Sequence, residues 1–286
     1  MRTLATGPFQ SGDRVQLTDE KGKMYSFFLI SGGQWHSHNG WINHDEIIGQ
    51  DEGVVVLSNS GTKYQVLRPL LNDYVLSMGR GATIIYPKDS AVIVGFADIF
   101  PGAKVLEAGA GSGALSISIL RAISEKGKLQ SFEERDEFLE IARRNVKEYF
   151  GYLPENWQLN SGRVQEGNFS GEFDRVVFDM LAPWDALDTA ANALRPGGVL
   201  CCYVATTTQL SRTAEALRES NLFSEPESME ILLRNWHHEG LAVRPQHSMN
   251  AHTGFLLFAR KMKPGVPPIR RRRRPAKGAY PEPTDS

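Results

Sequence analysis

Cysteines and long apolar runs are both scarce in this 286-residue sequence. Its two cysteines, Cys201 and Cys202, are adjacent inside an apolar run, so they offer neither a disulfide framework nor the spacing of metal ligands. We interpret them as part of a buried strand in a reducing cytoplasm. No apolar run reaches the roughly 18 residues that a membrane-spanning helix needs, and the N-terminus lacks the apolar segment of a secretion signal.

Charge of one sign is also not in excess, because the formal net charge is −1. The last 23 residues, 264–286, carry six basic and two acidic residues, hence +4, so the other 263 residues carry −5. A nucleic-acid-binding domain usually has a basic surface. A polyanionic partner would therefore have to meet a local patch or the mobile-looking run Arg270–Arg274.

Three zones follow one another along the chain. Residues 1–66 contain short β-like segments around turns at 20–23 and 59–61, which predicts a small β-barrel-like module. In residues 67–263 strand and helix patterns alternate, which predicts an α/β fold with a parallel sheet covered by helices on both faces. Residues 264–286 are rich in proline and arginine without apolar periodicity, which predicts disorder.

In this alternating zone the sequence predicts nine helices and strands. Some of the predicted strands are near-continuous apolar runs, which is typical of strands buried on both faces. Strands are expected at 103–109, 127–133, 173–180, 197–205 and 253–261. Helices are expected at 113–124, 136–151, 185–194 and 209–221, the second of them closed by Gly151.

Between the first of these strands and its helix, glycines occupy every second position: Gly109, Gly111 and Gly113. Glycines at this place let a ligand approach the backbone and the helix N-terminus. The window fits the dinucleotide pattern G-x-G-x-x-A, and with Glu107 it also fits the E-x-G-x-G-x-G pattern of S-adenosylmethionine (SAM) methyltransferases. Glycines alone would also serve a tight turn.

Two carboxylates bear on the choice of cofactor. Glu133, at the end of the next predicted strand, would accept hydrogen bonds from ribose hydroxyls of either cofactor. Glu107, read as part of the loop, favours SAM, because a carboxylate suits a sulfonium and an ammonium group and opposes a pyrophosphate.

Four segments in this order, 78–89 (MGRGATIIYPKD), 105–115, 178–184 (FDMLAPW) and 203–209 (YVATTTQ), closely resemble the TrmI family. These are tRNA adenine-N1 methyltransferases that modify the T-loop adenosine numbered 58. Residues 240–261 resemble the C-terminal segment of the family's actinobacterial branch. The resemblance implies a Rossmann-like class I SAM-dependent methyltransferase domain, a small N-terminal β domain, a tRNA substrate and a homotetramer.

The resemblance also carries over cofactor-binding residues one by one. Gly109, Ala110, Gly111, Ser112 and Gly113 match the SAM loop, and Glu133 matches the ribose acid. Asn168 falls where the family often has an aspartate near the adenine, and its amide oxygen can still accept from the adenine amine. Phe138 stands where some relatives have a histidine.

Asp179, after an apolar run at a predicted strand end, is the expected catalytic residue and would also border the cofactor. Adenine N1 already has a lone pair, and methylation leaves a cationic ring. A carboxylate that accepts a hydrogen bond from the N6 amine would stabilise that product. The alternative reading is a helix N-cap or an ordinary loop aspartate.

Three further residues are expected at the substrate. Tyr86 precedes Pro87, which biases it to an extended conformation, and it would form a wall for the flipped base or pack in the core. Trp184 would be a lid or a packing residue. Gln209 would hold the base, on resemblance alone. The seven histidines lack the spacing of a metal site.

Other functions stay open at this stage. They are a methyltransferase acting on a protein or a small molecule, an NAD-dependent oxidoreductase, and a tRNA-binding subunit without catalysis. Reaching N1 in folded tRNA requires extruding the base, which costs a few kcal/mol. Phosphate contacts from the N-terminal module or from grooves between subunits would have to offset that cost.

Overall fold

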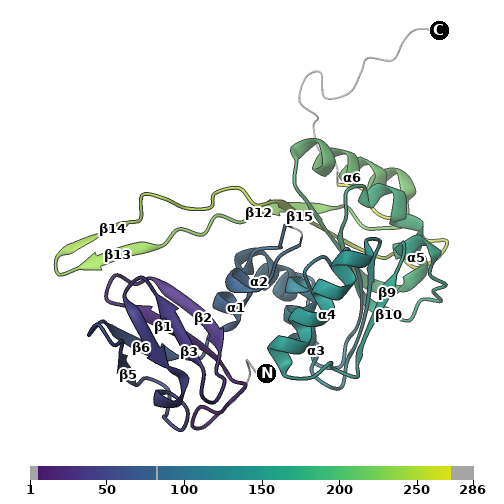
Figure 1. Cartoon of the computed structure of the whole chain (residues 1–286). Helices are drawn as coiled ribbons and strands as arrows, with labels where there is room; N and C mark the ends of the chain where they lie inside the picture. Colours follow the sequence, from purple (N-terminus) through teal and green to yellow (C-terminus); the bar gives the residue numbers. More distant parts are fainter. Residues whose placement is uncertain (1–5, 82, 272–286) are drawn as a thin grey trace.

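The computed structural model describes residues 6–81 and 83–271 (Figure 1). Its N-terminal part is an antiparallel sheet of order β2-β1-β6-β5 with a separate hairpin, β3–β4. The strands are β1 (Arg14–Asp19), β2 (Met24–Phe28), β3 (Gln34–Ser37), β4 (Gly40–Asn43), β5 (Val55–Leu57) and β6 (Lys63–Leu67). β1 pairs with β2 and β5 with β6, which confirms the two hairpins expected around 20–23 and 59–61.

This N-terminal sheet is open, where the sequence suggested a barrel-like module. β2 and β5 are its outer strands. Trp35 of β3 stacks on Phe27 of β2 with ring centroids 5.6 Å apart, and it meets Tyr64 of β6 edge-on at 5.3 Å. The hairpin therefore covers one face of the sheet and closes its small apolar core.

The rest of the chain is built on a seven-stranded sheet of order β12-β15-β11-β10-β7-β8-β9. From β9 to β11 all neighbours are parallel, as the alternation predicted. The expectation was wrong for β15, which is antiparallel to β11 and β12. The strands are β7 (Lys104–Ala108), β8 (Lys128–Glu133), β9 (Trp157–Ser161), β10 (Phe173–Asp179), β11 (Leu194–Val204), β12 (Glu227–Glu230) and β15 (Phe255–Arg260).

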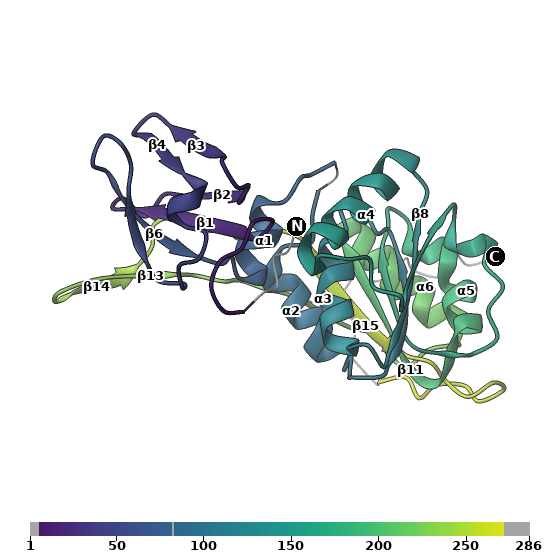
Figure 2. The ribbon, with the colours of Figure 1, turned by 60° about the horizontal axis from the view of Figure 1, so that its bottom comes forward.

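Helices lie on both faces of this sheet (Figure 2). Residues of α1 to α4 pack into the apolar core on one face, and residues of α5 and α6 into that on the other. Cys201 belongs to the first core and Cys202 to the second, and both are free and buried, which confirms the strand interpretation. The helices are α1 (Leu71–Ser77), α2 (Pro87–Phe96), α3 (Ala114–Ile123), α4 (Asp136–Phe150), α5 (Leu187–Ala193) and α6 (Thr207–Ser220), with the 3-10 turns η1 (His44–Glu46), η2 (Val164–Glu166) and η3 (Pro183–Ala186).

Local signals fix several helix ends. α4 ends at Gly151, which has a φ of +85°, a conformation that glycine adopts without strain. α2 begins at Pro87, where a missing N–H costs nothing. Across the described residues, no helix is long and apolar enough to cross a membrane.

An arm of residues 231–254 projects from the sheet between β12 and β15, and it contains the paired strands β13 (Trp236–Glu239) and β14 (Ala242–Pro245). Figures 1 and 2 both show it extending past α2 toward the N-terminal sheet. The arm exposes large apolar side chains, namely those of Leu232, Leu233, Trp236, Leu241 and Val243. It buries little of its own surface within this chain.

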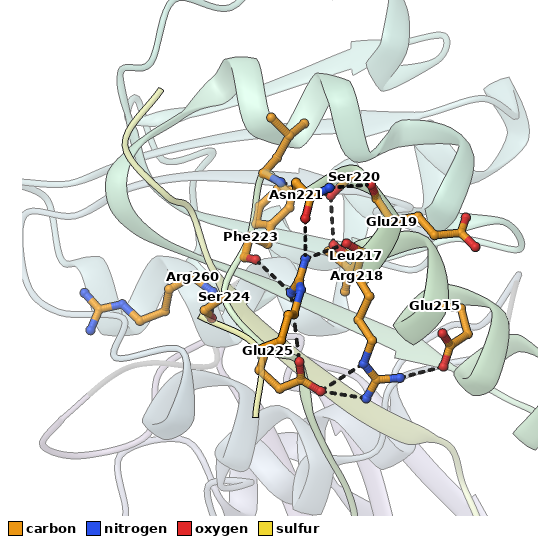
Figure 3. A network of polar contacts seen from close by, with 12 residues as sticks. Glu215, Leu217, Arg218, Glu219, Ser220, Asn221, Phe223, Ser224, Glu225 and Arg260 are labelled. Atoms are coloured by element: carbon orange, nitrogen blue, oxygen red, sulfur yellow. Dashed lines mark hydrogen bonds and ion pairs between the residues drawn. The ribbon is translucent and has the colours of Figure 1, made fainter. Parts of the chain in front are cut away.

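The described C-terminal end is held against α6. Arg218 of α6 pairs with Glu215 at 2.6 Å and with Glu225 at 2.8 Å (Figure 3). Arg270 donates hydrogen bonds to three oxygens around the end of α6, the backbone carbonyls of Arg218 and Phe223 and the side chain of Asn221. A cation is favourable at a helix C-terminus.

These contacts change the view of the basic tail. The sequence predicted a mobile segment from Pro264 onward. Residues 264–271 indeed form no helix or strand, but Arg270 is anchored to α6 and Arg271 pairs with Glu227. The prediction for Arg272–Arg274 and the following residues lies outside the described part of the chain.

Candidate active site

A cavity of about 570 Å³ opens at the carboxyl ends of β7, β8 and β10, the edge at which parallel α/β sheets bind ligands. It combines backbone of the glycine loop with acidic and basic side chains. Its lining residues are Ala108, Gly109, Phe132, Glu133, Glu134, Arg135, Gly162, Arg163, Val164, Gln165, Asp179, Met180, Leu181, Ala182 and Asp185.

The glycine loop joins β7 to α3. Gly109, Gly111 and Gly113 have φ angles of +86°, +54° and +79°, which only glycine adopts without strain. The amide of Gly109 donates to the carbonyl of Phe132 on β8 at 2.9 Å. A Cβ on Gly109 would lie 1.9 Å from the carbonyl oxygen of Asp179. Glycine at position 109 therefore allows the close approach of β10. The absence of a side chain also leaves the loop backbone accessible to a ligand.

Glu133 ends β8 and reaches the glycine loop. Its carboxylate accepts hydrogen bonds from the amide of Gly111 at 2.9 Å and from the backbone and Nε of Arg135, both at 3.2 Å. The Arg135 guanidinium lies 3.8 Å from the centroid of the Phe138 ring. Both carboxylate oxygens of Glu133, the acid predicted to bind the ribose, are thus held by hydrogen bonds. Phe138 contacts Arg135 and does not line the cavity.

Glu107 lies on β7, behind the cavity, where the sequence placed it inside the loop. It is completely buried, and its Oε2 accepts hydrogen bonds from Ser116 at 2.7 Å and Ser131 at 2.5 Å. Its Oε1 has no hydrogen-bond partner among the described residues. Burial raises the pKa of Glu107 to about 7, against the effect of the two serines. In this structure Glu107 joins β7 to Ser116 of α3 and Ser131 of β8, and it does not line the cavity.

Asp179 is the last residue of β10 and the parallel neighbour of Tyr203 on β11. Burial and, to a smaller extent, the charges of Glu107 and Glu133 together raise the pKa of Asp179 to about 7, against the opposing effect of Arg135. Such perturbed acids gather in functional clefts. The helix-cap alternative does not hold, because the N-caps of η3 and α5 are Ala182 and Ala186.

Tyr86 is the residue before α2 and has an extended backbone with ψ of 149°, as the following proline predicted. It is half-buried. Tyr86 is absent from the cavity lining given above, so its contact with a substrate base stays a prediction.

Trp184 and Gln209 have partners that the sequence did not reveal. The Arg212 guanidinium lies 4.2 Å from the centroid of a Trp184 ring, and Trp184 is absent from the cavity lining given above. Gln209 accepts hydrogen bonds from Thr206 as a cap of α6, and its Nε2 donates to the carbonyl of Leu181 at 2.9 Å. Gln209 thus ties α6 to the loop that follows Asp179.

Asn168 is exposed, beyond the 3-10 turn η2, and does not line the cavity. That stretch of chain instead contributes Gly162, Arg163, Val164 and Gln165. Gln165 is the neutral polar side chain that this segment contributes to the cavity lining. Nothing in the spacing of the sequence distinguishes Gln165 from Asn168.

The Y-P-K-D segment also contains a buried ion pair that sequence reasoning missed. Lys88 Nζ donates to Asp89 at 2.8 Å, to the hydroxyl of Thr253 at 2.5 Å and to the carbonyl of Ile231 at 2.8 Å. Thr253 in turn donates to Asp89 at 2.6 Å. Asp89 is completely buried. This network fixes the start of α2, and with it Tyr86, to the root of the arm.

Two of the seven histidines, His44 and His252, make structural contacts. His44 is buried, and its Nδ1 accepts from the amide of Ile30 at 2.9 Å. His252 lies 2.7 Å from a carboxylate oxygen of Glu230 and 2.8 Å from the carbonyl of Ala205. Within residues 6–81 and 83–271, no group of three histidine, cysteine, aspartate or glutamate side chains is arranged to hold a metal ion.

Comparison with known proteins decides the family. A family model described as "tRNA methyltransferase complex GCD14 subunit" matches residues 64–241, more than half of the chain. The chain belongs to this family. A second model, "TrmI-like N-terminal", matches residues 7–56. The GCD14 match contains β7, β8 and β10 with the whole cavity lining.

This chain also matches two curated relatives over nearly their whole length. The tRNA (adenine(58)-N(1))-methyltransferase TrmI of Thermus thermophilus is 36% identical over 248 residues, 86% of this chain and 96% of the relative. A TrmI of Methanocaldococcus jannaschii, named for adenines 57 and 58, is 28% identical over 276 residues, 88% of this chain and 94% of the relative.

Solved structures agree with the fold. The tRNA (m1A58) methyltransferase TrmI of Aquifex aeolicus has a TM-score of 0.79 and 29% identity, over 90% of this chain and 100% of its own. A SAM-dependent O-methyltransferase of Thermotoga maritima has a TM-score of 0.84 and 30% identity, over 93% and 96%. The fold is therefore that of class I SAM-dependent methyltransferases, with an N-terminal antiparallel sheet domain.

Proposed function

We propose that this protein transfers a methyl group from SAM to N1 of adenosine 58 in tRNA. The observation that carries the proposal is the match to the Thermus enzyme of that activity, at 36% identity along 96% of its length. The site supports it, because the family match includes the glycine loop and the strand-end acid Asp179.

The cavity fits the chemistry of SAM. When bound, SAM supplies an electrophilic methyl group on a cationic sulfonium. Four acids line the cavity, Glu133, Glu134, Asp179 and Asp185, against two arginines, Arg135 and Arg163, and this excess of acids favours a cation over the pyrophosphate of a dinucleotide. Glu133 would hold the ribose hydroxyls, and the backbone of Gly109 to Gly113 would face the cofactor.

Asp179 would act on the methyl acceptor. Its carboxylate would accept a hydrogen bond from the adenine N6 amine and so stabilise the positive charge that develops on the ring. Tyr86 would form a wall of the base site. Gln209 would act indirectly, by holding the Met180–Ala182 loop through the Leu181 carbonyl.

The assembly we propose is a homotetramer in the cytoplasm. The arm supports self-association, because Trp236 and Leu241 are exposed on it, and contiguous apolar surface usually marks an interface. The two free cysteines fit a reducing compartment. Light scattering of the purified protein tests the tetramer, and a monomer at micromolar concentration would refute it.

Nucleoside mass spectrometry tests the reaction. Unmodified tRNA transcript is incubated with the protein and SAM, with an Asp179→Asn variant as a matched control. We expect 1-methyladenosine at position 58 and none in a transcript carrying guanosine there. Methylation of protein or small molecules but not of tRNA would replace this proposal with the other substrate class, and binding of NAD in place of SAM would remove both.

A further inference from the structure

One buried amide connects two segments that border the site. Asn145 lies on α4 and is completely inaccessible to solvent. Its Nδ2 donates one hydrogen bond to the carbonyl of Ser112 at 2.9 Å and another to the carbonyl of Gly79 at 2.8 Å. Ser112 belongs to the glycine loop, and Gly79 to the segment between α1 and α2 that leads to Tyr86.

The same turn of α4 also holds the segment before Gly79. The hydroxyl of Tyr74, on α1, donates to the backbone carbonyl of Asn145 at 2.6 Å. A Cβ on Gly81 would lie 2.3 Å from the side chain of Ile141, one turn earlier on α4. The Gly79–Gly81 stretch is therefore pressed onto α4, and the amide of Gly81 also meets the hydroxyl of Ser112 at 3.4 Å.

Asn145 acts through the two N–H groups of its Nδ2 and not through its Oδ1. Its Oδ1 is buried and has no hydrogen-bond partner among the described residues. A buried acceptor without a partner costs about 1–3 kcal/mol. An apolar side chain of the same size would avoid that cost, so the amide is stabilising only through the two carbonyls that it joins.

We propose that Asn145 is a positioning residue that sets the spacing between the glycine loop and the Met78–Gly81 segment. Through a single planar group it would hold the loop in the position that cofactor binding needs. This inference rests on the proposed function for its readout in turnover, but its readout in SAM binding needs only the cofactor.

The chain contains a matched control for this arrangement. Asn156 also uses Nδ2 to donate to two backbone carbonyls, those of Ser124 at 2.8 Å and Gly127 at 3.0 Å. These carbonyls lie between α3 and the start of β8, at the edge of the sheet opposite the cavity. Loss of the Asn156 amide removes the same number of hydrogen bonds away from the site.

The experiment compares Asn145→Leu, Asn145→Ser and Asn156→Leu in the full-length protein. SAM affinity is measured by calorimetry, turnover with tRNA transcript, and folding by thermal melts. A reacting centre misplaced by about 1 Å loses about 100-fold in rate. We expect both Asn145 variants to lose at least tenfold in SAM affinity and 10- to 100-fold in kcat, and Asn156→Leu to stay within twofold on both.

Each outcome decides between positioning and bulk stability. A folded Asn145 variant with SAM affinity and kcat within twofold of wild type would overturn the proposal, and so would equal losses in Asn156→Leu. If the wild type binds SAM but leaves tRNA unmethylated, the proposed substrate fails, while the affinity comparison still tests Asn145. If Asn145→Leu does not fold, Asn145→Ser, which leaves room for water, supplies the comparison.

Discussion

Replacing Asp179 with asparagine should stabilise the protein while it removes activity. The pKa of Asp179 is raised to about 7 from an ordinary 3.8, first by burial and then by Glu107 and Glu133. Between these two values the folded protein binds more protons than the unfolded chain. Its stability therefore falls as pH rises through this window, and the full cost is present above pH 7. Asparagine keeps the shape and cannot ionise, so it removes the cost.

The size of the effect follows from the same two values. One pKa unit corresponds to about 1.4 kcal/mol, which gives an upper bound of about 4 kcal/mol. Asp179 is half-buried, so solvent screening reduces the expected gain to about 1–2 kcal/mol. For a domain of this size each kcal/mol raises Tm by roughly 2–4 °C.

Thermal melts and turnover measured together test this reasoning. At pH 8 we expect Asp179→Asn to melt several degrees above wild type, with the difference shrinking as pH falls toward 5. Turnover should drop about 10²–10³-fold, and wild-type kcat/KM should rise with pH through about 7 as Asp179 ionises. A variant that melts below wild type at pH 8, or that keeps near-normal turnover, would refute the assignment of Asp179 as a catalytic carboxylate whose ionisation destabilises the folded protein.

Four further changes have defined outcomes. Gly109→Ala should abolish SAM binding in calorimetry, because its Cβ would meet the carbonyl of β10 at 1.9 Å; retained affinity would mean that the loop is not the cofactor site. Lys88→Met leaves the buried carboxylate of Asp89 unpaired and should cost about 3–5 kcal/mol in denaturant unfolding, whereas an unchanged midpoint would contradict the ion pair. Ending the chain after Arg271 removes three arginines and should lower the slope of log Kd for tRNA against log salt concentration by up to about 2–3. Equal slopes for the two proteins would mean that the removed arginines do not contribute to tRNA binding. Ending it after Lys263 should in addition lower Tm, since the anchor to α6 is lost.

The parts of the fold that the sequence predicts are those with strong local signals. α4 is strongly amphipathic and closed by Gly151, and β10 and β11 are apolar on both faces. β12 is short and mostly exposed, so it has no apolar pattern to reveal it. The antiparallel direction of β15 depends on that hidden neighbour, because a strand that returns through a hairpin-like connection is reversed.

The residues of the candidate site also fall into those that local sequence patterns reveal and those that they do not. The loop glycines, Glu133 and Asp179 are found by spacing, and the structure brings Gly109, Glu133 and Asp179 to one cavity, whereas Gly111 and Gly113 do not line it. Lys88 and Thr253 are 165 positions apart, so no local pattern pairs them. Gln209 sits three residues after Thr206, the separation of a capping box, and that signal was present in the sequence beside its resemblance to a substrate-binding motif.

The arm has a consequence for how this enzyme can diverge. It leaves the sheet after Glu230 and returns at Phe255, and these two residues are paired neighbours on β12 and β15. An excursion between paired neighbours can lengthen, shorten or change its sequence without shifting the strand register. The contacts of Lys88 with Ile231 and Thr253 fasten both of its ends. The arm is thus a segment that can change over evolution or by grafting while the sheet that carries Asp179 is kept.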